Sequence, residues 1–116
     1  RWDKWANYPA DRSWLLDLVS EPDMRRTVFI SGDRHIHEIS VLRDTERSVP
    51  LVDITSSGLT HSWDNFPGEP NRLRHGDVFT GLGFGLLTID WSKEPPSIRL
   101  EIRDAADQVQ NSFLIP

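Results

Sequence analysis

The sequence predicts an α/β domain built mainly on one mixed or antiparallel sheet, with a single helix near its N-terminus. Three observations lead to this prediction. An amphipathic helical pattern occurs near residue 15, whereas short β-branched runs recur from residue 27 onward. The run at 97–103 alternates strictly between apolar and charged residues, which is typical of an antiparallel strand with one face in solvent. A length of 116 residues allows at most one ordinary domain.

The helix is expected over residues 9–20. Pro9 suits a first helical turn, and Pro22 disfavours helical backbone at the residue before it. Four apolar side chains would form one stripe along the helix, namely Trp14, Leu15, Leu18 and Val19.

Six strands are expected after the helix. They cover residues 27–30, 36–43, 51–56, 84–91, 97–103 and 109–115. Polar turns are expected at 44–48 and 104–107, and the glycines at 81, 83 and 85 are interpreted as a loop that enters a strand. The stretch 59–76 contains prolines, glycines and asparagines and is expected to be one long loop, a feature that is usually functional or disordered.

Composition excludes several classes of protein. Thirteen basic and eighteen acidic residues give a net charge of −5, which argues against a general nucleic-acid binder. Cysteine is absent, so the chain has no disulfide framework, thiolate metal site or cysteine nucleophile. No apolar run is long enough to span a membrane.

The densest group of chemically active residues lies at 31–38, directly after the first expected strand. Asp33 and His35 are one residue apart, so in an extended loop both side chains would point the same way. A carboxylate with an imidazole suits a transition metal. The alternative is that Asp33 caps a turn and His35 is a polar core residue. His37 is either a partner behind the site or a solvated strand residue, and we favour the second interpretation.

The long loop offers groups that suit a phosphate ester. Arg72 and Arg74 would present guanidinium groups, which bind phosphate oxygens in a bidentate manner. His61 is a candidate general acid or oxyanion partner. The alternative is a solvated loop whose arginines pair with nearby carboxylates, namely Asp64, Glu69 or Asp77.

These segments resemble a known family. The stretch VFISGDRH at 28–35 resembles the last metal-binding motif of the PhoD-like (alkaline phosphatase D) metallophosphatases, in which a strand ends in S-G-D-x-H. The resemblance continues in chain order through the aromatic segment at 3–16, DITSSGLTHS at 53–62, NRLR at 71–74 and the strands at 84–91 and 98–104.

The resemblance implies both a fold and an activity. Residues 1–116 would be the C-terminal part of a four-layer α/β-β/α metallophosphoesterase sandwich that hydrolyses phosphate mono- or diesters, with iron and calcium as cofactors. Asp33 and His35 would be metal ligands, His61 a catalytic residue, and Arg72 and Arg74 substrate-binding residues. Secreted or periplasmic localisation is implied in the same way.

The family's other metal motifs do not occur in this chain, and the chain opens on Arg1 without an initiator methionine. We therefore expect an N-terminal remainder of the same protein to supply those motifs, and the 116-residue chain alone to be inactive. The alternative is a non-catalytic β-rich binding or structural module that lacks them.

Overall fold

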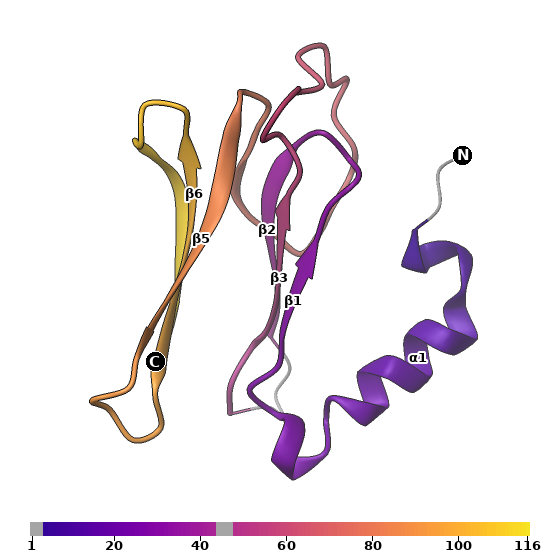
Figure 1. Cartoon of the computed structure of the whole chain (residues 1–116). Coiled ribbons are helices and arrows are strands. Elements are labelled where there is room, and N and C mark those ends of the chain that lie inside the picture. The colour runs from indigo at the N-terminus through magenta and orange to yellow at the C-terminus, as the bar shows by residue number, and fades with distance from the viewer. Residues whose placement is uncertain (1–3, 44–47) are drawn as a thin grey trace.

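The computed structural model describes residues 4–43 and 48–116 and shows a mainly β protein with two sheets and one short N-terminal helix (Figure 1). Most of the predicted turn at 44–48 lies outside the described residues. The chain begins with the short 3-10 helix η1 (Trp5–Asn7), the helix α1 (Pro9–Leu18) and a second 3-10 helix, η2 (Pro22–Met24). The strands follow in the order β1 (Val28–Ser31), β2 (His37–Leu42), β3 (Leu51–Ser56), β4 (Arg74–Phe79), β5 (Gly83–Asp90), β6 (Ser97–Asp104) and β7 (Val109–Ile115).

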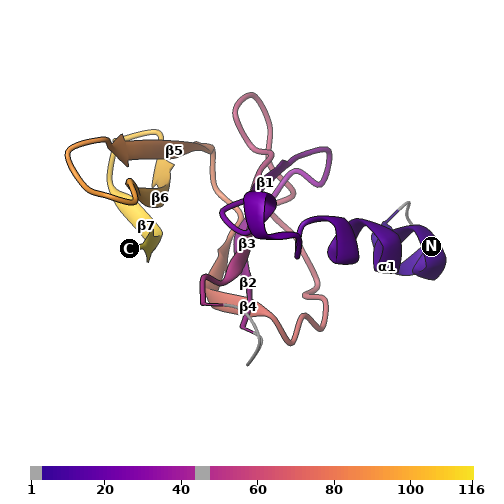
Figure 2. The ribbon, with the colours of Figure 1, turned by 90° about the horizontal axis from the view of Figure 1, so that it is seen from below.

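The strands form two separate sheets. The four-stranded sheet has the order β1-β3-β2-β4, with β1 parallel to β3 and the other pairs antiparallel. The three-stranded sheet, β5-β6-β7, is antiparallel throughout. It lies against one face of the four-stranded sheet, while α1 lies on the other side (Figures 1 and 2).

The prediction of essentially one sheet is therefore wrong. Two glycines where the chain passes from β4 into β5 lie at positions that leave no room for a Cβ. A Cβ on Gly81 would lie 2.4 Å from the ring of Phe79, and one on Gly83 would lie 2.3 Å from the carbonyl oxygen of Arg103. Close backbone approach of this kind is a role that glycine alone fills, and hydrophobic periodicity does not reveal it.

The core lies between the two sheets. Burial of these apolar side chains is the main favourable contribution to folding. The four-stranded sheet contributes Ile39, Val41, Val52 and Ile54, and the three-stranded sheet contributes Leu100, Ile102 and Ile115.

All six predicted strands are confirmed to within one residue at each end. The strand β4 was not predicted, because its first residues fall in the expected long loop. It contains Gly76 at φ 66° and the polar His75 and Asp77, which give no strand pattern. Pairing with β2 forms it instead, with Ile39 opposite His75.

The helix is confirmed over Pro9–Leu18, but its predicted apolar stripe is only partly buried. Val19, directly after the helix, is 2% exposed, whereas Trp14 is 65% exposed. Among the described residues, no helix is long and apolar enough to span a membrane.

Candidate functional site

Two histidines that are distant in sequence meet at one edge of the four-stranded sheet. Because β1 and β3 are parallel, the loops that follow them leave from the same edge. The amide of His35 donates a hydrogen bond to Ser57 Oγ over 3.0 Å, and its carbonyl oxygen accepts one from the amide of Trp63 over 2.8 Å. These two bonds fix the segment 57–63 against the loop after β1.

The rings of His35 and His61, called the histidine pair below, are in close contact. Their Nε2 atoms lie 3.2 Å apart, their ring centroids 4.1 Å apart, and their planes cross at 75°. Both residues are exposed, so the pair is open to solvent. On the far side of the second ring, Thr60 Oγ1 lies 3.0 Å from His61 Nδ1. The sequence suggested both residues as candidates, with different roles, but no sequence pattern indicated that their rings are in contact.

Asp33 lies on the same loop in a different conformation from the one expected. Its φ is 66° and that of His35 is 55°, so neither residue is extended and the expectation that their side chains point the same way loses its basis. The Asp33 side chain is exposed. In residues 4–43 and 48–116, no three His, Asp or Glu side chains gather into a metal cluster.

His37 is not the solvated residue that was favoured from the sequence. It is completely buried, and its ring packs on Phe79 at a centroid distance of 5.7 Å. Gly58 lies so close that a Cβ there would be 2.4 Å from His37 Nε2. The left-handed backbone at His35 breaks the alternation, so β2 begins at His37 with that side chain facing the core.

The two ring nitrogens of His37 have no hydrogen-bond partner among the residues described. Burial lowers the pKa of His37, and the nearby carbonyl of Gly81 opposes this only in part. The ring is therefore held neutral inside the protein.

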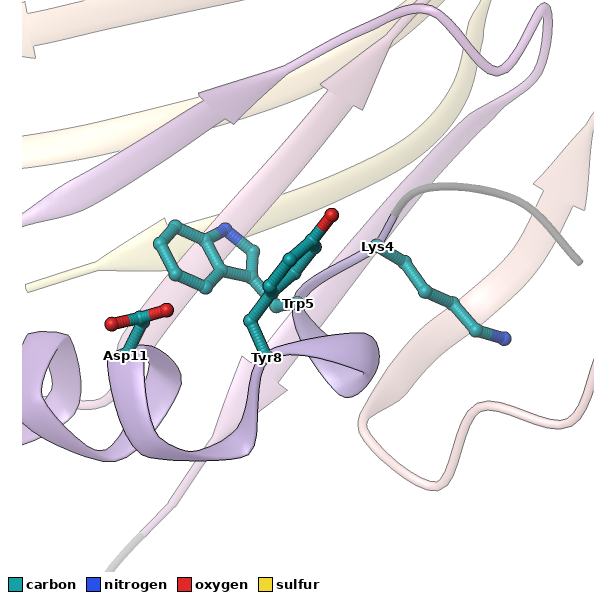
Figure 3. Close-up of a pocket in the computed structure, with 4 residues that line it drawn as sticks. All are labelled: Lys4, Trp5, Tyr8 and Asp11. Carbon is teal, nitrogen blue, oxygen red and sulfur yellow. The ribbon is translucent and has the colours of Figure 1, made fainter.

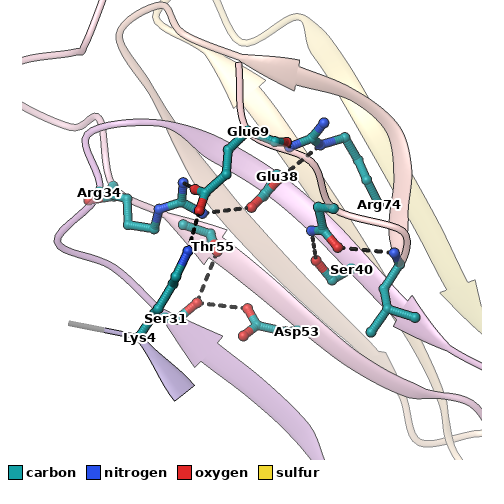
Figure 4. Close-up of polar contacts among 12 residues, drawn as sticks. Lys4, Ser31, Arg34, Glu38, Ser40, Asp53, Thr55, Glu69 and Arg74 are labelled. Atoms are coloured by element: carbon teal, nitrogen blue, oxygen red, sulfur yellow. Dashed lines mark hydrogen bonds and ion pairs between the residues drawn. The ribbon is translucent and has the colours of Figure 1, made fainter. Parts of the chain in front are cut away.

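Arg74 lies on the outer face of the four-stranded sheet, where it pairs with Glu38 (Figure 4). Its Nε donates to Glu38 Oε2 over 2.9 Å, and its Nη2 donates to the carbonyl oxygen of Glu69 over 2.9 Å. Arg34 binds the other Glu38 oxygen at 3.0 Å and also pairs with Glu69. Arg74 thus pairs with none of the three carboxylates that the sequence suggested; it meets Glu69 only through the backbone oxygen. Arg72 is exposed.

Sequence reasoning overlooked Glu38 and Asp53, which lie on neighbouring strands of that outer face. The Glu38 side chain is only 4% exposed, and Asp53 accepts a hydrogen bond from Ser31 Oγ over 2.7 Å. Burial raises the pKa of Asp53, the charge of Glu38 adds to this, and the Ser31 hydroxyl opposes it. Polar residues at alternate positions of β2 and β3 were the available signal, since they indicate a second, hydrophilic face.

Two hollows lie near the N-terminal helix. A cleft of about 430 Å³ separates α1 from the outer face of the sheet, and Asp33, Arg34, Glu38 and Asp53 are among the residues that line it. A second, more open hollow is lined by Lys4, Trp5, Tyr8 and Asp11 (Figure 3). The histidine pair lines neither hollow.

Comparison with protein-family models, with curated proteins and with solved structures finds no match for this chain.

Proposed function

We propose that this chain is part of a metal-dependent hydrolase of phosphate mono- or diesters, and that it supplies the last metal-binding loop of the active site. The observation that carries the proposal is the meeting of His35 and His61, with Nε2 atoms 3.2 Å apart, at the edge where the parallel strands β1 and β3 end. In open α/β sheets, ligands usually bind beyond the carboxyl ends of parallel strands, where polar groups from neighbouring loops meet. The motif at 28–35 supports the same proposal through its resemblance to the PhoD-like metallophosphatases.

The donor groups fit the expected metals in part. Imidazole nitrogens suit iron, whereas calcium takes oxygen ligands. His35 would hold the iron, and Asp33, on the same loop, is a carboxylate available to calcium. Bound metals of this kind polarise the phosphoryl group and lower the pKa of a coordinated water.

The roles of the other residues follow from where they lie. Arg72 is the exposed arginine of the pair expected to bind substrate, and in this proposal it contacts the phosphate oxygens. Arg74 holds Glu38 and the carbonyl oxygen of Glu69, so it shapes the loop that carries Arg72. His61 is the second imidazole of the site.

Two imidazoles and one carboxylate are too few to hold two metal ions, since such sites use several protein ligands each. In this proposal, the missing ligands come from an N-terminal remainder of the same protein, as part of a four-layer metallophosphoesterase sandwich. Secreted or periplasmic localisation belongs to the same proposal, and it rests on the resemblance alone.

The test uses the complete protein encoded by the gene, with p-nitrophenyl phosphate and its bis ester as substrates. We expect His35→Ala to lower turnover by at least about a hundredfold, as loss of a metal centre does. The matched control is His75→Gln, because His75 lies on β4 and contacts Ser112 and Phe113 instead of the site. The chain 1–116 alone should give no turnover.

Near-normal turnover and metal content in His35→Ala would contradict the assignment of that residue. A complete protein that binds metal yet hydrolyses neither ester would favour the non-catalytic binding module.

A further inference from the structure

The two Nε2 atoms of the histidine pair are separated by a distance that suits two ligands of one metal ion. Bonds from zinc and similar metals to imidazole nitrogen are about 2.0–2.1 Å long, so two such nitrogens are about 3.3–3.4 Å apart in tetrahedral geometry and about 2.9 Å apart at a right angle. The observed 3.2 Å lies between these values. The separation of the two nitrogens is therefore compatible with a single ion bound by both rings.

A neighbouring side chain orients the His61 ring for metal binding. With His61 Nδ1–H donating to Thr60 Oγ1, the lone pair of Nε2 faces His35. Ligating histidines usually have their other ring nitrogen fixed by such a partner, which sets the tautomer and orients the ring. With that tautomer of His61, His35 Nε2–H would donate to His61 Nε2 in the metal-free chain, and the proton would move to His35 Nδ1 on metal binding.

Hydrogen bonds also hold in place the backbone segments that carry the two histidines. The hydrogen bonds from His35 to Ser57 and from Trp63 to His35 connect the two loops on either side of the pair. The ring of Trp63 in turn packs edge-on against Phe66 at 5.2 Å. Because the pair is pre-positioned, little conformational entropy is lost when a metal binds.

We infer that His35 and His61 together form a two-imidazole site for a borderline divalent transition metal, with His61 as a metal ligand in place of the proton donor expected from the sequence. The inference deepens the proposed function and rests on it for the catalytic use of the metal. Binding itself is measured without substrate, so the two proposals can fail separately.

The class of metal follows from the donors. Paired neutral imidazoles suit zinc, copper, nickel and iron, and the order of affinity for such sites peaks at copper. Calcium prefers carboxylate and carbonyl oxygen and gains little from two nitrogens. Water and further ligands would complete the coordination sphere, because the pair is open to solvent.

The experiment titrates the 116-residue chain with Zn²⁺ by calorimetry and with Cu²⁺ by electron paramagnetic resonance, at neutral pH. We expect one ion per chain and nitrogen hyperfine splitting from two imidazoles. His35→Ala and His61→Ala should each weaken binding by at least about tenfold, since each removes half of the nitrogen donors. Because both side chains are exposed, circular dichroism should show both variants folded.

The control is His75→Gln, which should bind both ions as the wild type does, and millimolar Ca²⁺ should not compete. Unchanged Zn²⁺ affinity in a folded His61→Ala variant would overturn the inference. Loss of binding in His75→Gln, or the absence of binding by the wild type, would overturn it as well. Metal binding in a complete protein without esterase activity would leave this site intact and reject only the proposed hydrolysis.

Discussion

At the scale of single residues, His37 is the side chain whose burial has the clearest physical consequence. Its neutral ring fills the space between Phe79 and Gly58, where both nitrogens lack hydrogen-bond partners among the described residues. A charged imidazole is strongly disfavoured in such surroundings. The folded state therefore binds a proton at His37 less readily than the unfolded chain does.

This difference predicts a loss of stability in mild acid. The pKa of His37 is lowered from 6.5 in the folded protein, so the unfolded state takes up the extra proton as the pH falls below about 6.5. The free energy of unfolding should fall between pH 7 and pH 5, by about 1.4 kcal/mol for each unit by which the pKa is lowered. Urea midpoints measured across this range test the effect.

The matched variant is His37→Leu, which replaces the titrating imidazole with an apolar side chain that can still fill part of the buried space. Its stability should vary less with pH between 5 and 7 than that of the wild type. An equal pH dependence in both proteins would show that another group is responsible.

Asp53 adds a dependence of the opposite sign. Its pKa is raised above 3.8, so the folded state holds the proton more tightly, and the stability this gives is lost as the pH rises through the raised pKa. As the pH falls, protonation at Asp53 therefore favours the folded state, whereas protonation at His37 favours the unfolded state.

At the scale of elements, Glu38 connects β2 to two other segments that reach the same face of the sheet. It receives Arg34 from the loop after β1 and Arg74 from the start of β4, each through a different carboxylate oxygen. Since Glu38 is nearly fully buried, removing it would take a buried carboxylate from both guanidinium groups and leave each, among the described residues, with only its contact to Glu69.

We expect Glu38→Ala to lower the free energy of unfolding by about 3 kcal/mol or more, the usual effect of breaking a buried ion pair. The control is Glu69→Ala, which removes a more exposed carboxylate that pairs with Lys4 and Arg34. It should lower the same quantity by only about 1 kcal/mol or less. Equal losses in chemical denaturation would mean that burial of Glu38 does not matter.

Elements with strong local patterns were predictable, and those formed by long-range contacts were not. The strand β6 alternates Ile98, Leu100 and Ile102 with charged residues, and the structure places it over nearly the expected range. The strand β4 has no such pattern because it depends on pairing with β2. The division into two sheets likewise depends on which strands pair, and local patterns do not show this.

The same distinction between local patterns and long-range contacts holds for the residues of the candidate site. Motif and loop composition selected His35 and His61, which are 26 residues apart in sequence, but their contact depends on the parallel pairing of β1 with β3. The expectation of an extended backbone at Asp33 and His35 was wrong, so the predicted alignment of their side chains lost its basis. The interaction of Arg74 with Glu38 was missed because the outer face of the sheet was not recognised as polar.

At the scale of the whole molecule, the two faces of the four-stranded sheet serve different purposes. One face forms the core with the three-stranded sheet, while the other carries buried carboxylates and ion pairs beneath α1 (Figures 1 and 4). The histidine pair belongs to the edge where the loops after β1 and β3 meet. Our central claim is that this edge binds a transition metal.

The most direct test is anomalous X-ray diffraction from crystals of the chain grown with Zn²⁺. Metal binding by the histidine pair predicts one strong metal peak, about 2.0–2.1 Å from the Nε2 atoms of both His35 and His61. A peak bonded to only one of these rings, or no peak between them at full metal occupancy elsewhere, would contradict it.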